Sequence, residues 1–500
     1  MYDRVFIFEM SGPTLGFLEE RLDRLPHFRR FLKQGASSKL TGPLQPMVAP
    51  SCAVLYTGKN PGKTGFYDSF RFPAGSYDRI PYSLDDLQAE TFFQRLSSHG
   101  KRVGLLNACL THPLPEIDGF VVSGDEGIGE DYACPPEVLR TLRDSGYSVP
   151  FGASYSPGRE TAFLEHTLAV LEMRTRALRS LFADGKWSFG LLTVHLCGEL
   201  LHAFWKFYDR RHPDYRPFTE VFGGRDPFLE VLVRIDGLLG EMLEMAGPRG
   251  LVIAMGAWGH RLEHSTVYLN AVLEREGYLK FKRNPATQAK RMMFRLGISA
   301  SSAERIAHRL NLWKLFHYKL ARGKRSAVTG ATFLSYQDVD WSRTRAVAMG
   351  YLGQVFLNVR DHRPHGVVAP ENYEAERREL RRILEELEDP RNGQSMVDRV
   401  WAREEIYSGE QITHAPDLIV HFKEGYGAHH GIAGGDKPVA ASPENHSSDH
   451  HNESIFIAFG DGVRPGQIQA RLEDVAPTVL YALGVPIPSD YDGKVLPIFG

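Results

Sequence analysis

Cysteine is scarce in this chain, with four among 500 residues, and none of the four belongs to a Cys-x-x-Cys pair. The spacing excludes a disulfide-stapled scaffold and a cysteine-based zinc knuckle. A chain of this length can bury a large core without such links. We therefore expect a reduced, cytoplasmic protein. The four positions are Cys52, Cys109, Cys134 and Cys197.

Long apolar runs and an excess of charge of one sign are also missing. No run reaches the ~18–20 apolar residues that a membrane span needs, and the start of the chain lacks the basic and apolar regions of a signal peptide. Lys plus Arg number 59 against 61 Asp plus Glu, which gives a formal net charge of −2. We expect no membrane span, no signal peptide and no nucleic-acid partner. The sequence leaves the oligomeric state open.

Short apolar runs alternate with amphipathic segments along the whole chain. Continuous apolar runs are typical of parallel strands that are covered on both faces. Residues 373–387 carry leucine and isoleucine at helical spacing among Glu and Arg, which predicts a surface helix. This alternation predicts a doubly wound α/β core. The predicted strands are Val5–Phe8, Arg102–Leu106, Phe120–Val122, Phe189–Val194, Leu251–Met255, Ala346–Met349, Leu418–Val420 and Ile455–Phe459.

The segment from Lys280 to Arg325 departs from the average composition, with 13 Lys and Arg against one acidic residue, Glu304. A basic insertion of this kind either covers a cleft that attracts an anion, docks an acidic partner, or is a solvated helical insertion. We predict an α/β core over residues 1–264 and 330–500 and a basic, mainly helical cap over 265–329.

Framework motifs occur in order along nearly the whole chain. They are Thr57–Lys63, Leu269–Leu273 with Gly277–Leu279, Asp340–Ala346, Ala415–Leu418, and Glu473–Tyr481 followed by Gly484, Pro486 and Asp492–Gly493. Together they resemble the type I phosphodiesterase/nucleotide pyrophosphatase family of the alkaline phosphatase superfamily. The resemblance implies an α/β/α sandwich with a mostly parallel sheet. It also implies a cleft at the carboxyl ends of the strands, two divalent metals and a Thr or Ser nucleophile.

Most positions that should carry this chemistry are replaced. Ser11 stands where the resemblance implies an Asp ligand, and Val48 stands at the position of the nucleophile. Gly198, Ala257 and Trp258 occupy three further ligand positions, whereas His202 and His450 are kept. We therefore expect that the two-metal centre is lost and that no cofactor is bound. One zinc ion on His202 and His450 is the alternative, with Asp449 or Glu9 supplying an oxygen.

Other polar side chains are expected to face the cleft. Glu9 lies in an apolar first strand, where burial suits a general acid or base, or where it pairs with a neighbour. We predict Glu9, His202 and His450 as catalytic residues. The cleft would also be lined by Ser11, Ser51, Cys52, Trp258, His260 and His451. Cys52 fits equally well as a small buried hydrophobe.

Three functions follow from this pattern. The first is metal-independent acid/base chemistry on a small, anionic molecule in the ancestral cleft. The second is a catalytically inactive pseudoenzyme that acts as a binding or scaffold protein, since Val48, Ala257 and Trp258 fill the site with apolar groups. The third is a phosphoester hydrolase with a single metal. All three imply a small-molecule ligand.

Overall fold

A sheet of ten strands forms the centre of the fold in the computed structural model, which describes residues 1–73, 75–124, 131–148, 155–296, 298, 332–429, 431–432 and 438–500. Strands β1, β8, β9, β5 and β6 run parallel, whereas β18 is antiparallel to both of its neighbours and β7 is antiparallel to β6. The order across the sheet is β19 (Gly466–Gln467), β2 (Ala36–Thr41), β18 (Glu453–Gly460), β9 (Gly250–Met255), β1 (Arg4–Glu9), β8 (Phe189–Thr193), β5 (Val103–Ala108), β6 (Gly119–Ser123) and β7 (Ala133–Cys134), with β20 (Ala470–Arg471) beside β2.

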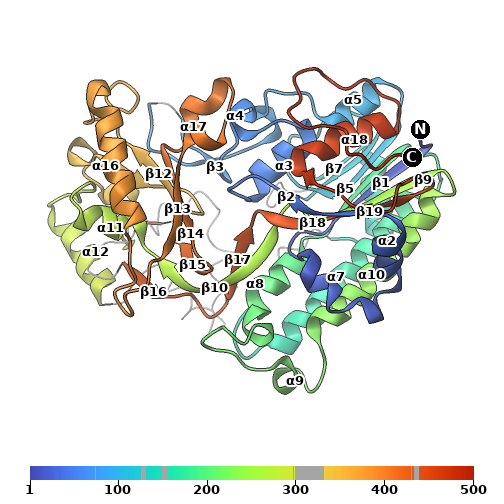
Figure 1. The fold of residues 1–500 in the computed structure, drawn as a ribbon, viewed down its shortest axis with the longest axis horizontal. Helices are drawn as coiled ribbons and strands as arrows, with labels where there is room; N and C mark the ends of the chain where they lie inside the picture. The colour runs from blue at the N-terminus through green and yellow to red at the C-terminus, as the bar shows by residue number, and fades with distance from the viewer. Residues whose placement is uncertain are drawn as a thin grey trace.

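Helices cover both faces of this sheet, as Figure 1 shows. Alternate residues of β1 point to opposite faces: Phe6 and Phe8 belong to one hydrophobic cluster, and Val5 and Ile7 to another. The first cluster packs against α1 (Leu15–Glu19), α2 (Pro26–Gln34), α6 (Pro136–Asp144), α7 (Glu160–Leu181), α8 (Leu196–Tyr208) and α10 (Pro227–Ala246). The second packs against α3 (Val48–Thr57), α5 (Phe92–Ser98) and α18 (Val475–Ala482). The predicted α/β/α sandwich with a mostly parallel central sheet is confirmed.

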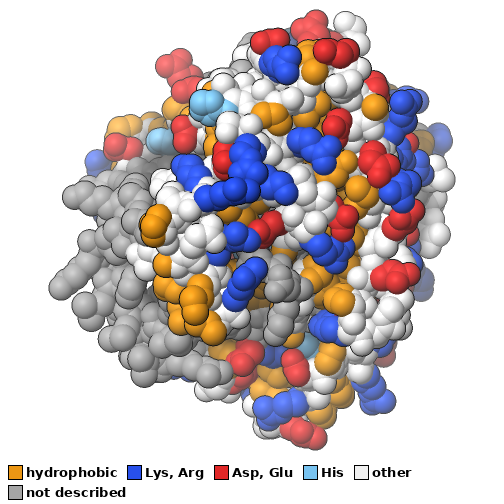
Figure 2. Space-filling view, turned by 90° about the vertical axis from the view of Figure 1, so that its left-hand side faces the viewer, with side chains coloured by type: hydrophobic (Ala, Val, Ile, Leu, Met, Phe, Trp, Pro, Cys, Tyr) orange, Lys and Arg blue, Asp and Glu red, His pale blue; other side chains and the backbone are white. Residues whose placement is uncertain are grey.

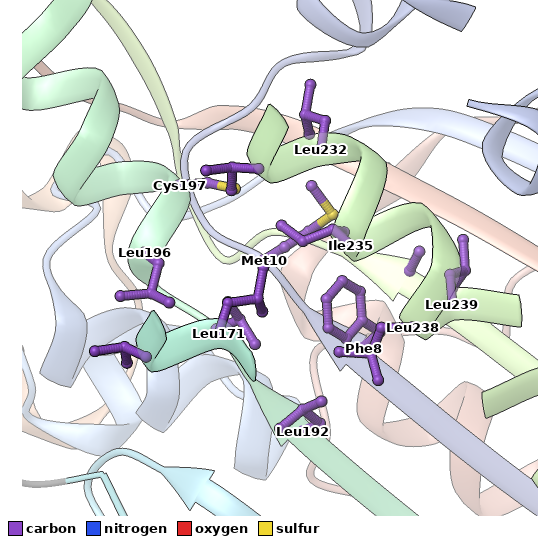
Figure 3. Packing of buried hydrophobic residues seen from close by; sticks show 14 of the residues in the cluster. Phe8, Met10, Leu171, Leu192, Leu196, Cys197, Leu232, Ile235, Leu238 and Leu239 are labelled. Atoms are coloured by element: carbon purple, nitrogen blue, oxygen red, sulfur yellow. The ribbon is translucent and has the colours of Figure 1, made fainter. Parts of the chain in front are cut away.

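The first cluster extends to the carboxyl end of β1, where the site begins. Figure 3 shows Phe8 and Met10 of the first strand and its continuation against Ile235 and Leu238 of α10. Both of the first-strand side chains are fully buried. Dense packing of this kind fixes the backbone that follows β1, and so the polar groups on it have little freedom to move.

A second region carries its own hydrophobic cluster. Four antiparallel strands form its sheet, in the order β11 (Ala346–Ala348), β12 (Gln354–Leu357), β14 (Leu418–Phe422) and β13 (Val397–Ala402). Helices α11 (Leu269–Arg275) and α16 (Tyr373–Glu385) contribute side chains to this cluster, and α12 (Pro285–Arg295) and α17 (Arg403–Ile406) lie in the same region. Strand β10 (Gly259–Val267) leads from the central sheet to this region and pairs with β15 (Gly425–Ala428), β16 (Val439–Ala441) and β17 (Ser448–His451). The shorter elements are α4 (Pro61–Thr64), α9 (Phe218–Val221), β3 (Phe70–Arg71) and β4 (Ile80–Pro81).

The predicted strands all exist, but the prediction that they run parallel is wrong for three of them. Strand β18 is antiparallel within the central sheet, and β11 and β14 belong to the separate antiparallel sheet. These strands are buried on both faces, so their sequences are as continuously apolar as those of parallel strands. The boundaries of the predicted cap stay a prediction, although Val339–Val439 shares its hydrophobic cluster with Val267–Phe281.

Part of the predicted basic segment is described, up to Arg295 and including Ile298, and residues 299–331 lie outside the described part of the chain. Lys290 forms an ion pair with Asp338 at 3.2 Å, and Arg291 pairs with Glu274. Figure 2 shows Lys and Arg side chains interspersed with Asp and Glu on this face of the molecule. The described basic residues of α12 are therefore largely neutralised by local acidic partners.

None of the helices in the described part of the chain combines the length and the apolar character that crossing a membrane requires.

Candidate functional site

The predicted site residues gather at the carboxyl ends of the central parallel strands. Glu9 is the last residue of β1, and Ser11 follows two residues later. Ala257 and Trp258 follow β9, and Gly198 lies in the first turn of α8, just after β8. The carboxyl edge of an open α/β sheet is where ligands bind in general, because the loops that follow parallel strands converge there.

The replaced positions now make structural contacts of their own. Ser11 is fully buried and donates a hydrogen bond from Oγ to Glu9 Oε1. Val48 begins α3 and packs against the second hydrophobic cluster. Ala257 and Trp258 belong to that cluster as buried side chains. No carboxylate, imidazole or hydroxyl ligand besides Ser11 stands at the positions of one implied metal site, so the residues present do not fit a two-metal centre.

Three histidines converge at the positions of the other implied metal site. His202 on α8, His260 on β10 and His450 on β17 each offer one ring nitrogen, and these nitrogens all lie within 4.8 Å of one another. Strands β10 and β17 bring two of them together directly, because His260 and His450 are register partners. The sequence predicted His202 and His450 as a pair and His260 only as a lining residue.

The Nδ1 atom of each of the three rings lies within hydrogen-bond distance of an oxygen of the protein. His202 Nδ1 donates to the carbonyl oxygen of Ser448 at 2.6 Å, and His450 Nδ1 donates to the carbonyl oxygen of Pro46 at 3.0 Å. His260 Nδ1 lies 2.9 Å from Ser448 Oγ. Such hydrogen bonds to the outer nitrogen are the usual support of metal-binding histidines, because they fix the ring orientation and leave Nε2 for the metal.

His260 Nε2 is buried and has no hydrogen-bond partner among the described residues. A buried nitrogen without a partner costs roughly 1–3 kcal/mol, so this nitrogen is a candidate for binding a ligand beyond the described residues. Three imidazoles with a free fourth position are the donor set of many catalytic zinc sites. The three histidines therefore fit a single metal ion.

Gly198 explains how His260 reaches this position. A Cβ atom at residue 198 would lie 3.3 Å from His260 Nε2 and 3.4 Å from the carbonyl oxygen of Ser11. A carboxylate at this position, which the family resemblance implies, would extend into the space that the His260 ring now fills. The absence of a side chain at Gly198 thus leaves room for the His260 ring.

A second ionisable cluster adjoins the three histidines. His446 Nε2 lies 3.2 Å from Glu263 Oε2 and 4.0 Å from Asp449 Oδ1, and its ring stacks on that of His202 with centroids 4.8 Å apart. Although burial opposes its charge, the Glu263 carboxylate raises the pKa of His446 to about 9. Asp449 is thus placed beside His446 and does not complete the three-histidine site in this structure.

The three converging histidines are held neutral. Burial is the main cause that lowers the pKa of His202 and of His260 well below 6.5, and neighbouring imidazoles add to the effect. Burial and His446 lower the pKa of His450 to about 3. Neutral imidazole is the form that binds metals, since protonation removes the lone pair.

Glu9 lies in a different group. Its Oε2 is 3.0 Å from His195 Nε2, and its Oε1 accepts from the Ala257 amide at 3.2 Å as well as from Ser11. Burial alone would raise the pKa of Glu9, but the charge and hydrogen bond of His195, together with Ser11 and Ala257, hold this pKa below its ordinary value. For His195, burial opposes protonation, while Cys109 and Glu9 raise its pKa well above 6.5.

Trp258 lies near both groups. The centroid of its ring lies 4.9 Å from that of His195 and 5.1 Å from that of His450. Its side chain is 3% exposed, and its Nε1 has no hydrogen-bond partner among the described residues. Glu9 lies with His195 through their direct contact.

The remaining predicted residues lie around this centre. Ser51 is fully buried in α3, and its Oγ has no partner among the described residues. Cys52 is buried in the second hydrophobic cluster, as expected of a small apolar side chain. His451 is half-buried on β17, and burial lowers its pKa to about 4. It shares with Asp449 and His450 the lining of a cavity beside β14.

Sequence reasoning missed His195 and Cys109. Cys109 Sγ lies 3.8 Å from His195 Nδ1. His195 directly follows the predicted strand Phe189–Val194, and Cys109 lies three residues after the end of the predicted strand Arg102–Leu106. Polar residues near the carboxyl ends of buried strands were the signal that could have found them. Their adjacency depends on the strand order β1, β8, β5, which the sequence alone does not reveal.

The fold and the site at the sheet edge define an α/β protein of the alkaline phosphatase type. The family model of type I phosphodiesterase / nucleotide pyrophosphatase matches residues 5–451. The chain therefore belongs to this family. Among solved structures, it is similar to phosphonoacetate hydrolase from Sinorhizobium meliloti 1021 in complex with phosphonoacetate. The TM-score is 0.57 with 15% sequence identity, and the match covers 97% of this chain and 96% of that chain. No curated protein matches the sequence.

Proposed function

We propose that this family member is a hydrolase of small anionic esters that uses one metal ion, held by His202, His260 and His450, instead of two. Two observations carry the proposal: His260 Nε2 is buried without a hydrogen-bond partner among the described residues, and one ring nitrogen each of His202, His260 and His450 lie within 4.8 Å of one another. A bound ion would supply Lewis-acid polarisation of an ester or water oxygen.

The chain's own residues support this function in three ways. The carbonyl oxygens of Ser448 and Pro46 hold the rings of His202 and His450 by their Nδ1–H groups. The missing side chain at Gly198 leaves room for the third ring. The loss of a nucleophile at Val48 means that water would have to attack the ester, since this valine has no nucleophilic atom. The small anionic substrate class rests on the family and on the position of the site at the carboxyl edge of the central sheet.

A direct test is the metal content of the purified protein, measured by elemental analysis after dialysis against zinc. We expect about one zinc per chain in the wild type and a clear loss in His260→Ala. His451→Ala is the matched control, because it removes a neighbouring histidine of β17 that does not belong to the cluster. Two zinc ions per chain, or equal metal content in the wild type and His260→Ala, would overturn the proposal.

Activity distinguishes the candidate functions further. Hydrolysis of an aryl phosphodiester should depend on added zinc or manganese and should fall with His260→Ala but not with His451→Ala. Metal binding without turnover would instead favour the binding role, which the buried Trp258 supports. Turnover that persists in a chelator would favour metal-independent acid/base chemistry, which the paired Glu9 and His195 support.

A further inference from the structure

Three ionisable side chains that the proposed metal site does not use lie at the carboxyl ends of three adjacent strands. Glu9 ends β1, His195 follows β8 by two residues, and Cys109 directly follows β5. Strand β8 lies between β1 and β5 in the sheet, so the imidazole stands between the carboxylate and the thiol. The three groups therefore form a line across the sheet edge.

Each ring nitrogen of His195 faces a different partner in this line. His195 uses Nε2 toward Glu9 Oε2, at 3.0 Å, and Nδ1 toward Cys109 Sγ, at 3.8 Å. The other carboxylate oxygen of Glu9, Oε1, accepts hydrogen bonds from Ser11 Oγ and from the Ala257 amide. A nucleophile, a base within hydrogen-bond reach and a third group that orients the base are the parts of a nucleophilic catalytic site.

The backbone around Cys109 is held in an uncommon conformation. Asn107 and Leu110 both have positive φ angles, of 60° and 55°, in a segment without glycine. Asn107 Nδ2 donates to the Thr193 carbonyl at 3.0 Å, and Tyr56 Oη donates to the Cys109 carbonyl at 2.9 Å. Strained positions of this kind persist only where the surroundings enforce them, and they concentrate at functional sites.

The charges around the line favour a thiolate beside an imidazolium. Glu9 and Cys109 face the His195 ring, and Tyr147, which bonds to Asn107, is another ionisable group near the thiol. Cys197 gives the contrast, because burial and the charge of Glu9 raise its pKa to about 12. A neighbouring imidazolium is the environment that turns a cysteine into a nucleophile.

We propose that Cys109, His195 and Glu9 form a nucleophilic triad that accepts the acyl group of a small ester or thioester. This activity goes beyond the metal-dependent hydrolysis proposed above and uses none of its ligands.

In the first step the proton of Cys109 passes to His195 Nδ1, and the thiolate sulfur forms a bond to the carbonyl carbon of the substrate. The bond from that carbon to the leaving alkoxide or thiolate breaks, and the leaving group takes the proton from His195. In the second step His195 accepts a proton from water, the hydroxide displaces the sulfur as the carbon–sulfur bond breaks, and the proton returns to the thiolate. Glu9 orients His195 and stabilises its charge, so it is a positioning residue.

The triad is tested on the whole protein in the presence of a chelator, which silences any metal-dependent hydrolysis. Iodoacetamide labelling from pH 5.5 to 9 is followed cysteine by cysteine with peptide mass spectrometry. Cys134 is the internal control, since it is more exposed than Cys109 and burial raises its pKa. At pH 6.5 we expect Cys109 to react about 10-fold faster than Cys134.

Two variants make the test specific. Glu9→Gln keeps an acceptor for Ser11 and Ala257 but removes the charge beside His195, and it should move the labelling profile of Cys109 toward higher pH. His195→Asn should bring Cys109 labelling near pH 6.5 down to the level of Cys134. The reactive group is then identified with p-nitrophenyl acetate, which should leave an acetyl group on Cys109 alone. The proposal is overturned if Cys109 titrates as an ordinary thiol in the wild type, or if labelling is the same in Glu9→Gln.

Discussion

Two groups of histidines near Trp258 have pKa values shifted in opposite directions. The pKa values of His202, His260 and His450 are lowered, because these rings are buried among other imidazoles. The pKa of His195 is raised, because Cys109 and the Glu9 carboxylate face its two nitrogens. Burial opposes the charge of all four rings. The neighbours therefore decide whether a histidine is ready to bind a metal or to hold a proton.

The difference also separates two kinds of chemistry within one sheet edge. Neutral imidazoles with anchored Nδ1 atoms suit metal binding, whereas an imidazole between a thiol and a carboxylate suits proton transfer. The Trp258 ring lies near both groups, with centroid separations of 4.9 Å to His195 and 5.1 Å to His450. Five substitutions test this division, in order of decreasing effect.

Removing the carboxylate of Glu9 should have the largest effect on the free energy of unfolding. Glu9→Ala leaves the buried His195 without its charge partner, and we expect a loss of about 3–5 kcal/mol in the free energy of unfolding at pH 7. Urea unfolding followed by circular dichroism measures it. Glu386→Ala removes one member of an exposed ion pair with Arg382 and should change stability by less than about 0.5 kcal/mol. Similar effects of the two substitutions would show that Glu9 and His195 are not coupled.

The pH dependence of stability separates the two kinds of histidine. The pKa of His260 is below 6.5 in the folded state, so the unfolded chain binds more protons in acid, and this residue should cost stability as the pH falls below 6.5. Between pH 7 and 5 that cost is about 2 kcal/mol for one such histidine. His260→Asn should therefore lose less stability over this range than the wild type, with both proteins in a chelator.

His195 should behave in the opposite sense. Its folded pKa is raised, so its contribution to stability is fully present below its ordinary value of 6.5 and is lost as the pH rises through the folded value. The lowered pKa of Glu9 makes the carboxylate's contribution present above 4.5 and lost in stronger acid. His195→Asn should thus cost more at pH 6 than at pH 9. An equal cost at both values would contradict the charged pair.

Filling the space beside His260 should have a smaller effect. Gly198→Ala places a methyl group 3.3 Å from His260 Nε2, and we expect zinc affinity to fall about 10-fold because the ring is displaced. Competition with a chromophoric chelator measures the affinity. Gly237→Ala, on α10 with open space around its Cβ position, is the matched control and should leave the affinity unchanged.

The indole nitrogen itself should matter least. Trp258→Phe keeps an apolar wall and removes an Nε1–H group that has no partner among the described residues. The lost volume and the removed unpaired donor act in opposite directions, and we expect a change of about 1 kcal/mol or less. Thermal unfolding measures this change. A loss comparable to that of Glu9→Ala would show that the indole has a polar role.

Much of the fold was predictable because local pattern and burial agree. The apolar run Val5–Phe8 falls within β1, and the helix predicted over 373–387 is α16, which ends at Glu385. The direction of β18 was not predictable, since strands that are covered on both faces have the same composition whether they run parallel or antiparallel.

The sequence by itself determined which groups were lost. A ligand position in the family is defined by its distance along the chain from a framework motif. The sequence alone therefore identifies the positions where the expected ligand or nucleophile is replaced, namely Ser11, Val48, Gly198, Ala257 and Trp258. The same spacing identified His202 and His450 as retained.

Only the tertiary structure decided which groups took their place. His260 joins His202 and His450 because β10 pairs with β17 beside α8, and the absent Cβ atom at Gly198 leaves room for its ring. Cys109, His195 and Glu9 meet because β5, β8 and β1 are neighbours in the sheet although they are far apart in the sequence. Proton states follow from these contacts, since desolvation and neighbouring charge act through space and not along the chain.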